Sequence, residues 1–431
     1  MDGTKMTENS LPQNWAARFF TIWTGQAFSL FGSALVQFAL IWWLTQKTGS
    51  ATVLAMASLF AILPHVVLGP LAGTVVDRTS RRLILITSDS MIALATVGLI
   101  LLFWSGKVEV WHVYAVLVIR SVGGVFHRPA MLASTSLMVP DKHLARISGA
   151  NQTLDGIQSI VAPPLGALLI GLLPMQQVLM VDVATAVMAV LPLFFIAVPQ
   201  PVALKTDAGA AQPKPSFLED FREGFRYVAA WPGLMAVLIM IAIFNFLLGP
   251  AVTLIPLLVT KYFRLGVMEL GWMNAAAGIG SIAGGLVLGV WGGFRKRIVT
   301  LLLGLIGVAV GLFMAGVAPT NLFAVALGGM VLADFTNAFI GGPLFAIIQS
   351  KARPDMQGRV MSLTITSITV MSPLSLLVAG PISDWFGIQV WYLVGGLVCI
   401  LMSVTAFFIP VIMNIENNHP ETDSAVVPTV K

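Results

Sequence analysis

Long apolar segments recur along almost the whole chain, and short polar loops separate them. A helix needs about 20 apolar residues to cross a bilayer core, and twelve segments reach that length. We expect spans at 20–44, 52–76, 84–104, 112–137, 150–173, 177–198, 234–259, 267–291, 298–318, 322–348, 361–383 and 390–413. The pattern therefore predicts an all-α membrane protein with twelve transmembrane helices.

One long polar stretch, residues 199–233, interrupts the pattern after the sixth span. From Phe217 to Tyr227 it alternates aromatic with charged residues. This alternation predicts an amphipathic helix, either on the inner membrane surface or as a solvated linker. The predicted domains are a six-helix bundle over 1–198, a cytoplasmic linker with this helix over 199–233, a second six-helix bundle over 234–413 and a cytoplasmic tail over 414–431.

Two short motifs occur once in each half of the chain at nearly the same offset. Pro140 and Pro354 open similar polar loops and lie 214 positions apart, and Gly69 and Gly285 lie 216 positions apart near the ends of two spans. These repeats predict two pseudo-symmetric bundles made from duplicated halves, and chance similarity of short loops is the alternative. In secondary transporters such halves rock against each other around a site near the bilayer midplane.

The composition agrees with a membrane protein and argues against several other classes. Hydrophobic residues make up 57% of the chain and charged residues 10%, whereas soluble domains carry roughly 25% charged residues. The net charge of +5 does not indicate nucleic-acid binding, because the basic residues lie in short loops and build no patch. The single cysteine, Cys399, excludes a disulfide within the chain and a CxxC metal or redox site. We expect no metal, no cofactor and no enzymatic activity.

The distribution of Lys and Arg predicts the orientation. If the N-terminus is cytoplasmic, the inner segments hold 19 of these residues. The outer loops then hold only Lys47, Lys107, Lys261 and Arg264. We therefore expect a multi-pass protein of the bacterial cytoplasmic (inner) membrane with both termini in the cytoplasm.

The loop between the second and third spans carries the most specific motif. It reads GTVVDRTSRR over residues 73–82 and resembles the loop signature of the major facilitator superfamily, G-x-x-x-D-R-x-G-R-R, with Ser80 in place of the usual glycine. The resemblance implies the fold of that superfamily, with two six-helix bundles. It also implies a gating loop whose residues are Gly73, Asp77, Arg78, Arg81 and Arg82.

A physical role for this loop follows from its charges. Asp77 can accept hydrogen bonds from the N–H groups at the start of a facing helix, where the helix dipole favours an anion. The arginines can pair with carboxylates across the two halves or stay at the lipid headgroups. Simple positive-inside anchoring is the alternative, and it explains the arginines but not Asp77.

Several further segments resemble Mef-type macrolide efflux proteins, over most of the chain and most strongly in the first 130 residues. They are IWTGQA at 22–27, TQKTGSA at 45–51, LGP at 68–70, IRSVG at 119–123, FH at 126–127, PA at 129–130, GRV at 358–360 and SP at 372–373. This resemblance implies drug export and antibiotic resistance, with macrolides as one substrate class.

Charged residues inside the spans are the candidates for energy coupling. No G-x-x-x-x-G-K-[ST] run points to ATP hydrolysis, which leaves an ion gradient as the energy source. Arg120 lies inside the fourth span, where an arginine costs about 3 kcal/mol and needs a partner. It is either a counter-ion whose pairing follows carboxylate protonation or half of a permanent ion pair; the resemblance to the superfamily favours a coupling role. Asp89, Asp182 and Asp334 lie deepest among the acids, and each either carries a proton or forms a fixed hydrogen bond.

Other polar and small residues in the spans have candidate roles. We expect Trp23, Gln26, Asn245 and Asn337 to line a substrate cavity. His65 follows a proline and is interpreted as a satisfied polar group at a kink. The small-xxx-small spacings of the eighth span predict close helix packing. Their residues are Gly280, Gly284, Gly285 and Gly289.

The sequence thus predicts a proton-coupled exporter, a drug/proton antiporter, of small amphipathic organic compounds. Its partners would be the small-molecule substrate, protons and membrane lipid, without nucleic acid, and it would act as a monomer. Export of an endogenous metabolite such as a siderophore fits the same fold. Import is a further alternative, and a non-transporting sensor or scaffold is disfavoured because no sizeable soluble segment is present.

Overall fold

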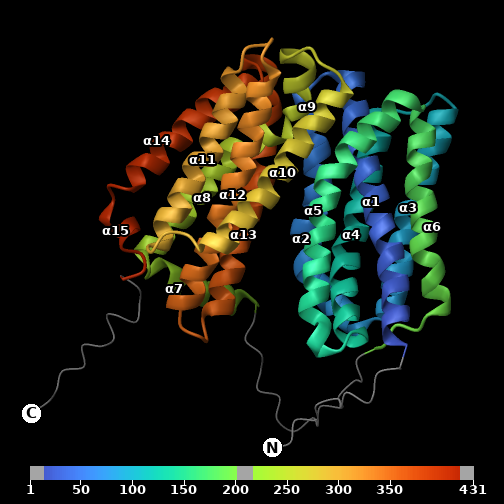
Figure 1. Cartoon of the computed structure of the whole chain (residues 1–431), viewed down its shortest axis with the longest axis horizontal. Coiled ribbons are helices and arrows are strands. Elements are labelled where there is room, and N and C mark those ends of the chain that lie inside the picture. Colours follow the sequence, from blue (N-terminus) through green and yellow to red (C-terminus); the bar gives the residue numbers. More distant parts are fainter. Residues whose placement is uncertain (1–13, 201–216, 418–431) are drawn as a thin grey trace, which may run out of the picture. The chain divides into compact units, whose positions relative to one another are not determined.

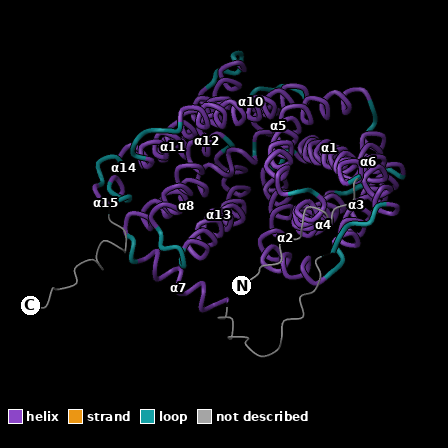
Figure 2. Tube along the Cα trace, turned by 60° about the horizontal axis from the view of Figure 1, so that its bottom comes forward, coloured by secondary structure: helices purple, strands orange, loops and turns teal. Residues whose placement is uncertain are grey.

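The computed structural model describes residues 14–200 and 217–417, and in that part all regular structure is helical (Figure 1, Figure 2). Eleven of its helices are long and apolar enough to cross a membrane, and each overlaps one predicted span. They are α1 Trp15–Thr48, α2 Ala51–Arg78, α3 Arg81–Trp104, α4 Val110–Met138, α5 Asp141–Leu172, α6 Met175–Phe195, α8 Pro232–Thr253, α10 Val267–Trp291, α11 Arg297–Val317, α12 Phe323–Lys351 and α13 Gln357–Phe386. The all-α membrane fold is confirmed.

The twelfth predicted span, 390–413, is interrupted. A π-helical turn, Trp391–Gly395 (η3), leads into α14 Gly396–Ala406, and the short α15 Pro410–Met413 follows. Pro410 has no N–H to donate to the carbonyl four residues earlier, so Ile409 N–H bonds the Ala406 carbonyl at 3.2 Å instead. The seventh span is likewise extended beyond α8 by α9 Ile255–Leu257 and a π-helical turn, Leu258–Tyr262 (η2).

The described residues pack as two compact units. The first comprises those of Met1–Gly49, Met56–Lys205 and Val267–Gly271. The second comprises those of Ser50–Ala55, Thr206–Gly266 and Trp272–Lys431, so it includes the first turn of α2. The single cysteine, Cys399, is fully buried inside the second unit.

Four helix starts of the first half recur in the second half with one period. The pairs Ala51 and Val267, Arg81 and Arg297, Asp141 and Gln357, and Met175 and Trp391 each lie 216 positions apart. This period agrees with the offsets of the two sequence motifs. Because four independent helix starts share it, chance similarity is a poor explanation, and the repeat supports duplicated halves.

The predicted amphipathic segment forms α7, Phe217–Ala229. Gly224 is buried, and Glu223 accepts a hydrogen bond of 2.5 Å from the Arg359 guanidinium at the start of α13. The helix therefore packs against its own unit and is not a free solvated linker. Residues 201–216 of the predicted linker, the side chains of 217–221 and residues 418–431 of the predicted tail lie outside the described part.

Of the two glycine pairs in α10 for which close packing was predicted, only one packs against a neighbouring helix. A Cβ atom added at Gly280 would lie 3.0 Å from the backbone nitrogen of Phe335 in α12, and one added at Gly284 would lie 2.7 Å from its carbonyl carbon. Gly285 and Gly289 have no such neighbour within 4 Å. The close packing prediction is thus right for one pair of glycines and wrong for the other, which lies on an open face.

We expect Gly284→Ala to lower the thermal unfolding temperature of the detergent-purified protein. The added methyl group must push α10 away from α12, and overpacking of this kind costs typically about 1–3 kcal/mol. Gly285→Ala is the matched control, because alanine is favoured over glycine in a helix by about 1 kcal/mol and meets open space there. Equal unfolding temperatures for the two variants would contradict the close approach.

Candidate functional site

Polar side chains of α1 repeat at helical spacing. Gln26, Ser29, Ser33 and Gln37 follow one another at intervals of three, four and four residues. Residues three and four apart lie on the same face of a helix. This face contributes to two buried polar clusters and to a cavity, all within the first unit.

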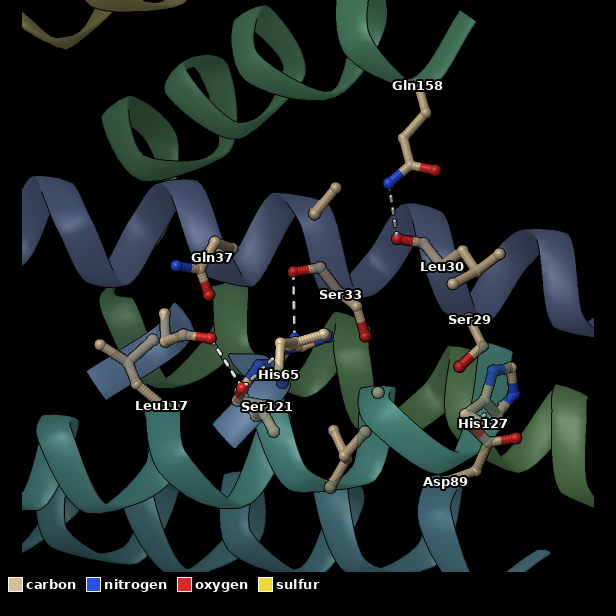
Figure 3. A pocket seen from close by; sticks show the side chains of 15 residues that line it. Ser29, Leu30, Ser33, Gln37, His65, Asp89, Leu117, Ser121, His127 and Gln158 are labelled. Carbon is tan, nitrogen blue, oxygen red and sulfur yellow. Dashed lines mark hydrogen bonds and ion pairs between the residues drawn. The ribbon is translucent and has the colours of Figure 1, made fainter. Parts of the chain in front are cut away.

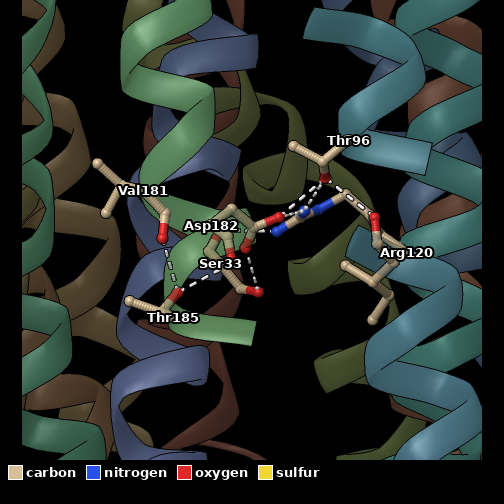
Figure 4. A network of polar contacts seen from close by, with 7 residues as sticks. Ser33, Thr96, Arg120, Val181, Asp182 and Thr185 are labelled. Carbon is tan, nitrogen blue, oxygen red and sulfur yellow. Dashed lines mark hydrogen bonds and ion pairs between the residues drawn. The ribbon is translucent and has the colours of Figure 1, made fainter. Parts of the chain in front are cut away.

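The first cluster is an ion pair between Arg120 of α4 and Asp182 of α6 (Figure 4). The guanidinium Nη1 lies 2.5 Å from the Asp182 Oδ2, and the two side chains are 8% and 1% exposed. Ser33 and Thr96 donate further hydrogen bonds of 2.9 Å to Oδ1 and Oδ2 of Asp182. Arg120 Nη2 donates to the Ser33 carbonyl at 3.0 Å. Both carboxylate oxygens are therefore satisfied, and Arg120 pairs with Asp182 and not with Asp89.

The second cluster joins Gln26 of α1, Asp89 of α3 and His127 of α4. Gln26 Nε2 donates to Asp89 Oδ2 at 3.0 Å, and Gln26 Oε1 lies 2.7 Å from His127 Nε2. His127 Nε2 is also 3.4 Å from Asp89 Oδ1. All three residues are buried. Gln26, a predicted cavity residue, is thus held between two titratable groups.

A cavity of about 370 Å³ lies beside both clusters (Figure 3). That volume is at the lower end of drug-sized ligand pockets, roughly 300–1,000 Å³. Helices α1 to α5 line it. The polar residues on its wall are Ser29, Ser33, Gln37, His65, Asp89, Arg120, Ser121, His127 and Gln158. His65 Nδ1 lies 2.8 Å from the Ser121 hydroxyl, which donates to the Ala61 carbonyl at 2.7 Å, in agreement with a satisfied polar role for His65.

Two arginines of the gating loop, Arg81 and Arg82, donate to backbone carbonyls of neighbouring helices. Arg82 donates from Nε to the Leu193 carbonyl at 2.5 Å and from Nη2 to the Phe194 carbonyl at 2.8 Å, at the last turn of α6. Arg81 donates from Nη1 to the Ala133 carbonyl at 2.5 Å. Arg82 thus lies at the negative end of the α6 dipole, which favours a cation. Both arginines bind carbonyls and not the carboxylate or headgroup partners that we expected. Ser80, which replaces the usual glycine, caps α3 by accepting a 3.4 Å hydrogen bond from Leu83 N–H.

The loop carboxylate, Asp77, is exposed near the end of α2, as are Gly73 and Arg78. Among the described residues, no hydrogen bond to the Asp77 side chain is formed. The predicted contact of Asp77 with a helix start therefore stays a prediction.

A carboxylate does bind a helix start at the other end of α2. Asp384 of α13 accepts hydrogen bonds from Ala51 N–H at 3.0 Å and Thr52 N–H at 3.3 Å, and from the Thr52 hydroxyl at 2.7 Å. These residues all belong to the second unit. Asp384 was not predicted from the sequence, although Gly380 precedes it by four positions, as Gly73 precedes Asp77.

The other predicted site residues do not join the two polar clusters. Trp23 donates to Asn151 Oδ1 at 2.7 Å, and Asn245 donates to the Ile241 carbonyl of its own helix at 2.9 Å. Asp334 is half-buried and Asn337 is exposed, both on α12 of the second unit. None of these four residues lines the cavity of the first unit.

The two units differ in polarity despite their shared period. The positions 216 residues after Asp89, Thr96 and Asp182 hold Leu305, Leu312 and Val398. The second unit contains a cavity of about 390 Å³ between α7, α8 and α13, whose wall is apolar except for Thr366 and Ser367. The buried charges described above thus lie in the first unit.

Comparison with known proteins gives matches along most of the chain. The sequence profile of the Major Facilitator Superfamily matches residues 22–376. Macrolide efflux protein A of Streptococcus pyogenes is 34% identical over 391 residues, which cover 91% of this chain and 95% of that protein. The multidrug efflux pump Tap of Mycolicibacterium fortuitum is 27% identical, with coverages of 88% and 92%. The crystal structure of the nucleoside transporter NupG superposes with a TM-score of 0.68 at 11% identity, covering 91% of this chain and 98% of that one, a likeness of fold alone.

We expect Arg120→Leu to reduce the yield and thermal stability of the detergent-purified protein strongly. The substitution leaves Asp182 buried without its charged partner, and such a loss costs about 3–5 kcal/mol. The double variant Arg120→Leu with Asp182→Leu should recover most of that stability, because removal of both charges is often nearly neutral. A double variant no more stable than Arg120→Leu would contradict the energetic coupling of the pair.

Proposed function

This chain belongs to the major facilitator superfamily, and from that membership we propose that it is a proton-coupled exporter of small amphipathic organic compounds, with macrolides among its substrates. The observation that carries the proposal is the 34% identity to a macrolide efflux protein over 91% of the chain. The protein is a multi-pass protein of the bacterial inner membrane. We further propose that both termini are cytoplasmic, that it acts as a monomer and that it moves its substrate without chemical change.

A proton gradient supplies enough energy for useful export. One charge that moves through 100 mV releases about 2.3 kcal/mol, and one pH unit adds about 1.4 kcal/mol. Together, about 3.7 kcal/mol supports a substrate gradient of roughly 500-fold for one proton per substrate. For a monocationic substrate exchanged one for one, only the pH contribution remains.

The geometry of the first unit supports coupling of this kind. An antiporter needs an ionisable group that holds a proton in one conformation and releases it in another. Asp89, Arg120 and His127 line one cavity, and Asp182 is bound to Arg120 beside it. A proton that enters this cavity can therefore change the charge that a substrate meets.

Transport into inverted membrane vesicles tests this function. We expect vesicles that contain the protein to accumulate erythromycin when respiration acidifies their interior, and an uncoupler should abolish the accumulation. Vesicles without the protein are the control. Uptake that persists with the uncoupler would contradict proton coupling, and uptake of a hydroxamate siderophore in place of drugs would favour the metabolite alternative.

We also expect Asp77→Ala to slow transport while leaving erythromycin affinity within about twofold of the wild type. The reason is that the predicted contact of Asp77 acts on the conformational change and not on the substrate. Initial rates in proteoliposomes and equilibrium binding in detergent measure the two quantities, with Thr79→Ala as a control in the same loop. A wild-type transport rate for Asp77→Ala would refute the gating role.

A further inference from the structure

The first unit holds two buried carboxylates whose surroundings differ, and this difference separates their roles. Asp182 accepts two hydroxyl hydrogen bonds and contacts the Arg120 guanidinium at 2.5 Å. Protonation of Asp182 would leave a buried arginine without its counter-charge, which is strongly unfavourable. The Arg120–Asp182 pair is therefore suited to stay charged throughout the transport cycle.

Asp89 has different partners. One is the neutral carboxamide of Gln26 and the other is the imidazole of His127, which is able to gain or lose a charge itself. No fixed cation contacts Asp89 among the described residues. A proton added at Asp89 or at His127 therefore leaves no permanent charge unpaired.

The orientation of the Gln26 carboxamide assigns one partner as donor and the other as acceptor. An amide oxygen only accepts hydrogen bonds, so the 2.7 Å contact with Gln26 Oε1 requires a proton on His127 Nε2. The amide nitrogen only donates, so the 3.0 Å contact requires an acceptor at Asp89 Oδ2. The arrangement thus fits an ionised Asp89 beside a histidine whose Nδ1 is left to take up a further proton.

The opposite orientation of the Gln26 carboxamide fits a proton on Asp89 and none on His127 Nε2. Its oxygen would then accept from a protonated Asp89, and its N–H group would donate to a bare His127 Nε2. In that orientation the neutral His127 carries its own proton on Nδ1. A half-turn of the amide therefore accommodates an added proton on Asp89, and the orientation described first accommodates it on His127 Nδ1. Few side chains between a carboxylate and an imidazole have this property, because it needs a donor and an acceptor at equal reach.

We propose that the Gln26–Asp89–His127 triad is the proton-binding site of this protein, with Gln26 as the positioning residue; this inference rests on the proposed proton-coupled export. A proton from the cavity binds the Asp89–His127 pair and raises its net charge from one negative charge to none, and its release restores that charge. Arg120, Asp182 and His65 are the other titratable or charged groups at or beside the same cavity. Arg128, next in the chain to His127, is exposed.

Two variants test the site by transport. In proteoliposomes, Asp89→Asn and His127→Gln should still exchange erythromycin between equal concentrations, since exchange needs no proton. Under a gradient of one pH unit, accumulation of this monocation should fall from up to roughly tenfold in the wild type to about onefold in the two variants. His143→Gln is the matched histidine control, because His143 stacks on Trp15 outside the triad. Proton-driven accumulation that survives in both triad variants would overturn the proposal.

A spectroscopic measurement tests the site without transport. Nitrogen NMR of histidine-labelled protein in detergent, with the His127 signal identified by its loss in His127→Gln, should show a His127 signal that changes with pH. Asp89→Asn and Gln26→Leu should each shift that titration. A His127 signal that does not change with pH, or whose change is unaffected by Asp89→Asn, would refute the site.

The two measurements separate failure of this inference from failure of the proposed function. If the wild type accumulates nothing while His127 titrates in dependence on Asp89, the site stands and proton-driven drug export is wrong. If the wild type accumulates erythromycin and both triad variants do so too, export stands and the site is wrong. If a variant fails to fold, the wild-type titration and the Gln26→Leu shift decide.

Discussion

A charge buried among membrane helices needs a partner inside the protein, because lipid offers neither hydrogen bonds nor counter-charge. Arg120 meets this constraint through Asp182 and the Ser33 carbonyl. Thr96 completes the cluster by donating to Asp182. These four residues come from α1, α3, α4 and α6, so one ion pair connects four helices of the first unit. This connection restricts the rotation of the four helices about their axes. The cavity and the Asp89 cluster lie beside these helices.

Apolar length alone predicted most of the fold. Each span needs a minimum number of apolar residues, and this need marks the helices even where internal polar groups occur, as in α4 and α12. The break near Pro410 was not predicted, because hydropathy does not register a missing N–H group. The packing of α7 against α13 could not be predicted from the sequence either, since an amphipathic pattern shows which face is apolar but not what covers it.

The site was predicted less completely, for a related reason. Arg120, Asp89 and Asp182 were found because charges in a span are costly, and depth along the helix axis placed them within reach of one another. Depth does not give the direction in which a side chain points, so the choice of Asp182 as partner needed the structure. Gln26 and His127 cost less to bury, so neither stood out as a partner of Asp89. The polar spacing along α1 was a usable signal that the sequence analysis overlooked.

The burial of Cys399 has a practical consequence for following conformational change. Its side chain has no exposed surface, and no second thiol exists in the chain. Thiol-directed spin labels or fluorophores will therefore react with an introduced cysteine and spare the native one. Pairs of such probes, one in each unit, can report the distance between the units as substrate and pH are varied. The native Cys399 in α14 need not be replaced for this purpose.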